Sequence, residues 1–365
     1  MMSFRYLSLS IIFTTSIIAL SNAANAAAIP VTCTTNNPNA ISIALATALS
    51  TAKLGAYLQF NVTGNCVDYI YIPQGVSASI TGSGSGAYGA SLSASTSSQP
   101  AIAVNGQLTL TGFSVTSSYS TDSVLKVGTG GWLGIYNSSI SSNTTNNAVH
   151  ATNGGTLTIE NSIITGAQNS AVEIGQDAYA WIDATNNSST VISYTGNGGQ
   201  AIGCWQSVLG IGTTGHGKVT IGPSSAQGIS ARGCRATIGN SSMLQNSVII
   251  TGAVQAGIRA KNSDSISLVG AYMHDNPNIS IEVSAGTVEL DTSTINVPTN
   301  GTGLLAQRDG TIYFNHINGN GINNVTGTNP YSCYQNGHIY ADAAYPPSGG
   351  ASSAGCLIIG GSTTH

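Results

Sequence analysis

Charged side chains are scarce in this 365-residue sequence, in which lysine, arginine, aspartate and glutamate together make up 6%. Nine basic and 13 acidic residues give a formal net charge of −4. Coiled coils and charged disordered tails need far more charge, and nucleic-acid binding needs a basic surface. The composition therefore excludes these classes, and we expect no nucleic-acid partner.

Long hydrophobic runs are also missing, except for one near the N-terminus. Residues 6–20 are mostly apolar, follow Arg5 and precede a run of small residues, which is the order of a secretory signal peptide cleaved at Ala24-Asn25-Ala26. A membrane anchor is the alternative, but about 15 apolar residues are short of the roughly 20 that span a bilayer. We expect residues 1–26 to be removed on export, leaving a mature chain without a membrane span that is secreted, periplasmic or at the cell surface.

Cysteine pairs with the spacing of a metal site are absent as well. The sequence has six cysteines and no Cys-x-x-Cys, and an even count in an exported chain favours disulfides. Three sequential pairs are the simplest of the 15 possible connectivities, with the middle pair reduced in the core as the alternative. The predicted pairs are Cys33 with Cys66, Cys204 with Cys234, and Cys333 with Cys356.

An internal repeat is the clearest positive feature of the chain. Two apolar or small residues at i and i+2 recur from residue 101 in steps of 23 to 30 residues, and a second such pair follows each about seven residues later. A spacing of two indicates strands, and this period matches one coil, or rung, of a parallel β-helix. A leucine-rich repeat would show its leucine signature, and a β-sandwich would lack the register. The first members are Ile102, Leu125, Val149, Val172, Ile202, Ile229, Ile258, Ile281 and Leu304.

The repeat predicts an all-β parallel β-helix of about 10–11 rungs. Residues 27–100 would form the N-terminal cap and first irregular rungs, residues 101–328 the regular rungs, and residues 329–365 an irregular, disulfide-bearing tail that covers the last rung. A short capping helix is expected near residues 39–54, behind an Asn39 N-cap. Its buried face would comprise Ile41, Leu45, Ala48 and Leu49.

The N-terminal part of the chain also resembles a known superfamily. Cys33, Ala40-Ile41, Leu58-Gln59-Phe60, Gly64-Asn65-Cys66 and Ile70-Tyr71-Ile72, followed by rungs to about residue 325, resemble the pectin-lyase-like superfamily. The resemblance implies a right-handed parallel β-helix. Members include polysaccharide lyases, polygalacturonase-type hydrolases, phage tailspikes and adhesin passengers, so it does not select a function.

Two of the four polygalacturonase motifs have similar counterparts here. Gly215-His216-Gly217 and Arg259-Ala260-Lys261 resemble the last two motifs. The position of the aspartate pair reads Gly198-Gly199-Gln200, and no Asn-Thr-Asp occurs. Hydrolysis by that mechanism therefore lacks the carboxylates that protonate the leaving oxygen and activate water.

The first strand of each rung predicts an outward row of candidate binding residues. The row contains an exposed tryptophan flanked by basic residues, which suits stacking on a sugar ring and pairing with a uronate carboxylate. Scattered solvated charges around one surface tryptophan are the alternative. The row consists of Glu173, Trp205, Arg232, Arg259 with Lys261, and Glu282.

A lyase would need a base, and Arg259 or Lys261 could serve, with Asp264 and Asp275 the nearest acids in sequence.

The two glutamates of the row on the first strand are too far apart for glycosidase chemistry. Glu173 and Glu282 are four rungs apart, roughly 19 Å. Paired glycosidase carboxylates lie about 5 to 9.5 Å apart. These two glutamates therefore cannot be one acid–base pair.

The second strand offers a closer couple of carboxylates. Glu160 and Asp183, next to Trp181, would lie about 5 Å apart on adjacent rungs, close enough to raise one pKa or share a Ca²⁺ ion. The alternative is that the irregular step of 30 residues shifts the register and separates them.

Taken together, these features favour an exported structural, adhesive or carbohydrate-binding protein without an enzymatic role. We expect a monomer that contacts polysaccharide or a cell-surface glycan through Trp205, Arg232, Arg259 and Lys261, with no cofactor and no metal. The alternative is a lyase or hydrolase of uronate-containing polysaccharide, with Ca²⁺ if it is a lyase. Its candidate residues are Arg259, Lys261, His216, Glu160 and Asp183.

Overall fold

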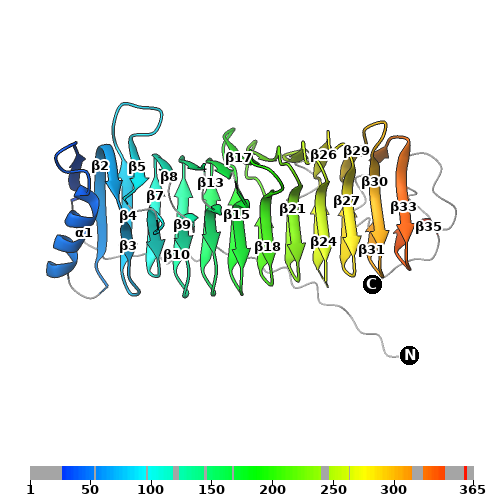
Figure 1. The fold of residues 1–365 in the computed structure, drawn as a ribbon, viewed down its shortest axis with the longest axis horizontal. Coiled ribbons are helices and arrows are strands. Elements are labelled where there is room, and N and C mark those ends of the chain that lie inside the picture. The colour runs from blue at the N-terminus through cyan, green and yellow to red at the C-terminus, as the bar shows by residue number, and fades with distance from the viewer. Residues whose placement is uncertain are drawn as a thin grey trace.

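The chain forms an elongated stack of β-strand coils with a helix at its N-terminal end (Figure 1). The computed structural model describes residues 27–52, 55–95, 98–117, 123–143, 146–166, 168–239, 246–262, 264–314, 324–341 and 357–359. The predicted signal peptide, residues 1–26, lies outside these residues, and so does Cys356. The predicted parallel β-helix is confirmed.

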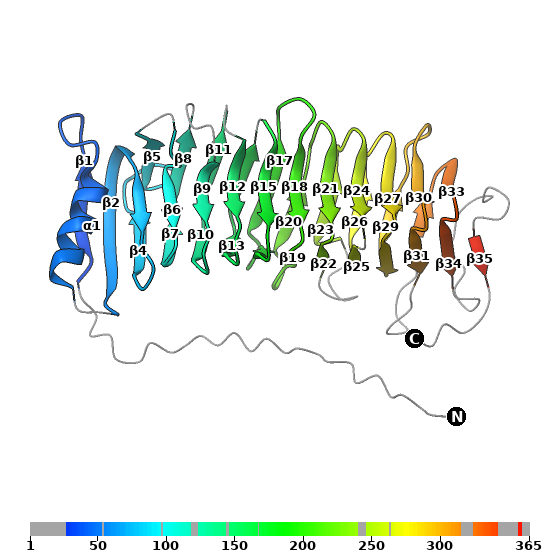
Figure 2. The same ribbon diagram turned by 60° about the horizontal axis from the view of Figure 1, so that its bottom comes forward.

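Each full rung contributes one strand to each of three faces. Among the described residues, face 1 is an eleven-stranded parallel sheet, whose strands lie side by side in Figure 2. This number agrees with the 10–11 rungs predicted. The face 1 strands are β3 (Ile70–Ile72), β6 (Ile102–Val104), β9 (Ser123–Val127), β12 (Asn147–Ala151), β15 (Ser170–Gly175), β18 (Gln200–Trp205), β21 (Gln227–Arg232), β24 (Ala256–Lys261), β27 (Ile279–Ser284), β30 (Thr302–Gln307) and β33 (Asn329–Tyr334).

Faces 2 and 3 belong to a second, 24-stranded sheet of the described residues. It begins with β1 (Ile29–Cys33) and the long β2 (Tyr57–Asp68), which pairs with the first strand of both faces. Face 2 continues with β4 (Ser77–Gly82), β7 (Gln107–Thr111), β10 (Trp132–Tyr136), β13 (Thr156–Glu160), β16 (Tyr179–Asp183), β19 (Val208–Ile211), β22 (Arg235–Gly239), β25 (Ser265–Val269), β28 (Thr287–Asp291), β31 (Thr311–Phe314), β34 (His338–Ala341) and β35 (Leu357–Ile359). Face 3 continues with β5 (Ala90–Ala94), β8 (Phe113–Ser117), β11 (Ser139–Ser142), β14 (Ile163–Gly166), β17 (Ser189–Tyr194), β20 (Lys218–Ile221), β23 (Val248–Thr251), β26 (Tyr272–His274), β29 (Thr294–Asn296) and β32 (Asn324–Thr326).

The core is a set of aliphatic columns that run along the stack. On face 1, Val149 pairs with Val172 and Val172 with Ile202, and on face 2 Leu133 pairs with Leu157. All of these side chains are inaccessible to solvent. Alternate residues point outward, so the predicted inward and outward positions of these strands are confirmed.

The corners between faces explain why glycine and asparagine are abundant. Asn137 and Asn161 take left-handed backbone conformations, at φ 48° and 51°, where β10 and β13 turn towards face 3. Gly64, at φ +88°, lies in β2, and a Cβ there would collide with the backbone carbonyl of Cys33. Positive φ recurs at these bends, and glycine and asparagine, which tolerate it best, occupy many of them.

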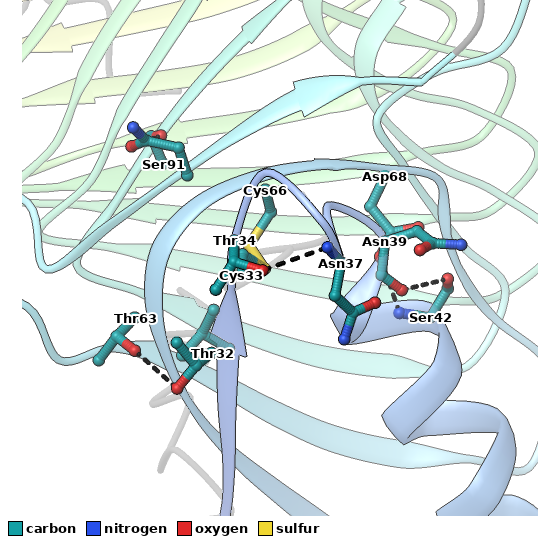
Figure 3. The surroundings of a disulfide bond; sticks show 12 residues. Thr32, Cys33, Thr34, Asn37, Asn39, Ser42, Thr63, Cys66, Asp68 and Ser91 are labelled. Carbon is teal, nitrogen blue, oxygen red and sulfur yellow. Dashed lines mark hydrogen bonds between the residues drawn. A yellow bond between two sulfur atoms is a disulfide. The ribbon is translucent and has the colours of Figure 1, made fainter.

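Helix α1 (Ala40–Thr51) covers the N-terminal end of the stack. Ile41, Leu45 and Ala48 are buried and Leu49 is partly buried, as the sequence predicts. Asn39 is the N-cap residue, as predicted, but its side chain makes no capping hydrogen bond. Instead, the Asp68 carboxylate accepts the Ser42 backbone N–H at 2.8 Å, because the buried end of β2 brings a stronger acceptor to the first turn (Figure 3).

Two predicted disulfides are present among the described residues. Cys33 and Cys66 join β1 to β2 (Figure 3), and Cys204 and Cys234 join two neighbouring rungs. The alternative of a reduced middle pair is therefore wrong. Cys333 is also disulfide-bonded, while the predicted pairing with Cys356 falls outside the described residues.

Regular pairing extends beyond residue 328, where the sequence placed the start of the tail. β33 pairs with β30, β34 with β31, and β35 with β34. Tyr331 and Ile339 fill the inward positions of these strands and are buried, which continues the core past the last clear sequence repeat. Within the described ranges, no helix has the length and apolar character of a membrane span.

Candidate functional site

The predicted outward row of face 1 consists of two adjacent columns. In one column Trp205 is paired with Arg232, and Arg232 with Lys261. In the other, Arg259 is paired with Glu282. Glu173 lies in the same column three rungs before Arg259, through Gly203 and Ser230. The structure thus brings the predicted residues onto one face but places the acids in a different column from Trp205.

Trp205 has neighbours on its own rung and on the two adjacent rungs, and they differ in how much of the indole they cover. Its Nε1 edge lies over Gly203, where a Cβ would come within 3.1 Å of Nε1. The guanidinium carbon of Arg232 lies 5.1 Å from the indole centroid, a cation–π geometry. On the preceding rung Trp205 is paired with Gly175, around whose Cβ position there is no atom within 4 Å. One side of the indole is therefore covered by Arg232, while the other borders open space.

That open space is part of a groove of about 490 Å³ on face 1. Three different chemical groups lie in a row along this groove, a basic side chain, an imidazole and a carboxylate. They belong to Lys126, His150 and Glu173, which are paired on β9, β12 and β15. Asn169 Nδ2 donates to Glu173 Oε2 at 2.7 Å and fixes the carboxylate. The groove is lined by Lys126, His150, Thr152, Asn153, Glu173, Gly175, Gln176, Trp205 and Gln206.

We did not predict three of these lining residues, Lys126, His150 and Gly175, as site residues. The outward positions could be read from the repeat, but the groove depends on the missing side chain at Gly175. A glycine at a strand position, where neighbouring rungs carry Thr152 and Trp205, was the available sequence signal.

Arg259 is engaged in an ion pair rather than placed as a base. Its Nε donates to Glu282 Oε2 at 2.5 Å, with side-chain exposures of 23% and 7%. Gln307 Nε2 donates to the other carboxylate oxygen at 2.9 Å. Because the guanidinium is held in this charge-assisted hydrogen bond, the geometry favours an anchoring role for Arg259.

Lys261 has an environment closer to that of a base. Burial, followed by the charge of Arg259, lowers the pKa of its amine, with Arg232 and Arg308 acting in the same direction and Glu282 opposing them. A lysine with a lowered pKa has a larger fraction of the neutral amine, the form that can act as a base, at neutral pH. Lys261 is thus the predicted base candidate that the local electrostatics favour.

The two nearest acids in sequence do not form a cluster with Lys261. Asp264 is buried in the turn after β24, where it accepts the backbone N–H groups of Cys234, at 2.5 Å, and of Lys261. Burial raises the pKa of Asp264 to about 6. Asp275 lies on face 3, with Oδ2 2.7 Å from His274 Nδ1. Asp264 therefore supports the turn, and Asp275 is on another side of the stack.

His216 lies in the turn between β19 and β20, at the corner of faces 2 and 3. Arg259 and Lys261 are on face 1, two rungs further along. The two motifs that resemble polygalacturonase motifs are therefore on different sides of the stack.

Glu160 and Asp183 are paired directly on β13 and β16, so the predicted register is confirmed. Each carboxylate has its own partners. Glu160 Oε1 accepts the Thr185 hydroxyl at 2.9 Å, and Asp183 accepts the Ala184 backbone N–H at 2.7 Å and the Thr214 hydroxyl at 3.2 Å. Among the described residues, no group of three or more His, Cys, Asp or Glu side chains could hold a metal ion. A catalytic or Ca²⁺ role for the pair stays a prediction.

Comparison with known proteins gives only a distant likeness. No protein-family model matches the chain, and no curated protein sequence matches it. Among solved structures, the chain is similar to the catalytic unit of a thermostable GH87 α-1,3-glucanase from Streptomyces thermodiastaticus strain HF3-3. The two are 12% identical with a TM-score of 0.35, over 91% of this chain and 70% of that chain. A likeness this distant supports no conclusion about activity.

Proposed function

We propose that this protein binds an acidic polysaccharide along face 1, with the groove beside Trp205 as the site of one sugar ring. The observation that carries the proposal is the position of Trp205, which is braced by Arg232 on one side and faces the space above Gly175 on the other. An indole face beside a groove suits the CH-rich face of a pyranose ring. The role is binding or adhesion at the cell surface or in the extracellular space.

The order of charges along face 1 supports an acidic chain. Lys126 lies at one end of the groove, and Arg232 and Lys261 follow Trp205 on the next two rungs. These three cations outnumber the one carboxylate that lines the groove, Glu173. Rungs are about 4.8 Å apart, which is close to the length of one sugar residue in an extended chain. A polysaccharide that crosses the rungs would thus meet cations on both sides of the stacked ring, where uronate carboxylates can pair with them.

Filling the groove tests this proposal without removing any side chain. Gly175→Leu places a side chain beside Trp205, and the backbone at Gly175 allows it because its φ is not positive. We expect the affinity for polygalacturonate, measured by affinity electrophoresis and calorimetry, to fall at least tenfold in Gly175→Leu and in Trp205→Ala. Ser332→Leu, on β33 of the same face, is the matched control and should bind as the wild type does. Unchanged binding in Gly175→Leu would refute the groove as the sugar site.

A polysaccharide lyase is the second candidate, and the lowered pKa of Lys261 is the observation that favours it. In that reaction the Lys261 amine would remove the proton next to the uronate carboxylate, the C4–O bond to the leaving sugar would break, and a C4–C5 double bond would form. The leaving oxygen would take a proton from water. Incubation of the protein with polygalacturonate, with and without Ca²⁺, should then release unsaturated ends. Loss of this release in Lys261→Ala would overturn the binding role, whereas binding without products supports it.

We also propose that residues 1–26 direct export, that the protein is a monomer, and that it belongs to the pectin-lyase-like superfamily.

A further inference from the structure

A second aromatic surface lies on face 2. Trp132 and Tyr136 are the two ends of β10, and Tyr179 and Trp181 are outward residues of β16. Between these strands runs β13, whose outward residues include Thr156 and Thr158. All of these side chains are partly exposed. We call this surface the face 2 platform, and it consists of Trp132, Gly134, Tyr136, Thr156, Thr158, Tyr179, Trp181 and Gly210.

The rings of the platform lie over glycines in the sheet. A Cβ at Gly134 would come within 2.5 Å of Trp132 Cη2 and 2.6 Å of Tyr136 Cε2, so these two rings meet above Gly134. A Cβ at Gly210 would overlap the six-membered ring of Trp181. The indoles therefore rest against the sheet instead of projecting from it. The third tryptophan of the sequence, Trp205, is placed differently, with its Nε1 edge near Gly203 on face 1.

The charges around the platform differ from those of the face 1 groove. The strands β10, β13 and β16 contain no lysine or arginine. Glu160 and Asp183 lie in register along one edge of the platform. Carboxylates at this edge repel an acidic polysaccharide but accept hydrogen bonds from sugar hydroxyls. The complementary ligand is thus a sugar chain without charge.

The spacing of the platform also fits a chain of sugar rings. The aromatic rows on β10 and β16 are two rungs apart, roughly 10 Å, with the threonine row halfway between them. Successive residues of an extended polysaccharide advance by about one rung each. Two rings of the chain can therefore stack on aromatic rows, while the residue between them lies over the hydroxyls of Thr156 and Thr158.

We propose that the face 2 platform is a second carbohydrate-binding surface, specific for neutral polysaccharide and independent of the groove on face 1. The proposal does not rest on the proposed function, because it uses other residues on another face. The two ligands also differ in charge, so each surface can be tested with its own probe.

Affinity electrophoresis in gels that contain hydroxyethyl cellulose, galactomannan or dextran tests the proposal. We expect retardation of the wild type by at least one of these neutral polysaccharides. Trp181→Ala and Trp132→Ala should each weaken that binding about tenfold, and Trp181→Phe should restore most of it. Circular dichroism of each variant checks that the fold is intact. Gly210→Ser, which displaces the Trp181 ring but leaves the residue in place, should weaken binding as Trp181→Ala does.

Polygalacturonate and Trp205→Ala supply the controls. Trp205→Ala should leave the binding of neutral polysaccharide unchanged, and Trp181→Ala should leave the binding of polygalacturonate unchanged. Binding of the neutral chain should also be insensitive to salt, since no ion pair is involved. Failure of the wild type to bind any of the three neutral probes would overturn the proposal. It would be equally overturned by a dimer in sedimentation that Trp181→Ala dissociates, because the platform would then be a protein interface.

Discussion

The Cys204–Cys234 disulfide holds together the rungs that carry the face 1 groove. Cys204 directly precedes Trp205, and Cys234 follows Arg232 by two residues. The cation–π contact between Trp205 and Arg232 therefore spans the same two rungs as the covalent bond. Replacing both cysteines with alanine removes the bond while leaving every groove residue in place.

The expected loss of stability follows from the loop that the bond closes. The cysteines are 30 residues apart in the sequence. The chain-entropy relation gives about 12 cal/mol/K for a loop of this length, or about 3.6 kcal/mol at 25 °C. In a stack of repeats each rung contacts mainly its neighbours, so the loss should fall first on the rungs of β18 and β21. The indole and the guanidinium should then lose their fixed spacing.

Urea unfolding followed by tryptophan fluorescence, together with binding to polygalacturonate, measures both effects. We expect Cys204→Ala/Cys234→Ala to lower the free energy of unfolding by about 2–4 kcal/mol and to weaken binding. Cys33→Ala/Cys66→Ala is the matched control, because its cysteines are 33 residues apart and lie in the N-terminal cap. The control should lose about as much stability but bind normally. A stability loss below about 1 kcal/mol for the Cys204 variant, or equal binding losses in both variants, would refute this reasoning.

Two further predictions concern buried carboxylates. Asp68→Ala removes the acceptor of the Ser42 N–H at the start of α1 and should cost about 1 kcal/mol in urea unfolding; an unchanged midpoint would contradict the capping role. Burial raises the pKa of Asp264 from 3.8 to about 6, so the folded protein holds this proton more tightly than the unfolded chain does. Its contribution to the free energy of unfolding should therefore be largest below about pH 4 and fall by up to about 3 kcal/mol as pH rises through 6. Asp264→Asn should lack this step in unfolding curves measured from pH 4 to 7, and an identical pH profile in the variant would contradict the assignment.

The sequence predicts the stack well because the spacing of two between apolar residues in each repeat shows which side chains point inward. A residue such as Val172 must point inward on every rung, and its partners Val149 and Ile202 recur at fixed steps. The same register correctly placed Glu160 beside Asp183, because the step between them is a regular 23 residues and the longer step of 30 on face 1 does not shift it. Two disulfides were also predictable, since neighbouring rungs bring cysteines about one period apart into contact.

Contacts made across the stack were harder to predict. Asn39 is a good N-cap by residue type, but the acceptor at the start of α1 is Asp68, which is 26 residues from Ser42 in the sequence. The rungs continue past residue 328, because Tyr331 follows its partner Leu304 by 27 residues, within the range of the earlier steps. The inward residue at this position is a tyrosine instead of an aliphatic residue, so the repeat is harder to recognise there. The groove depends on the side chain that Gly175 lacks, and periodicity alone gives no weight to an outward glycine.

The three tryptophans show how a chain with few charges can still distinguish ligands. Two indoles lie over a glycine of the sheet, at Gly134 and Gly210, and the third is covered on one side by Arg232, so each ring has a fixed support beside which a sugar can stack. Stacking of this kind is similar for charged and neutral sugars, because it involves the CH groups of the ring. Selectivity must therefore come from the residues beside each indole. Arg232 and Lys261 continue the column of Trp205, whereas Asp183 lies on the same strand as Trp181. Two similar aromatic surfaces on one rigid stack are thus expected to prefer polysaccharides of different charge.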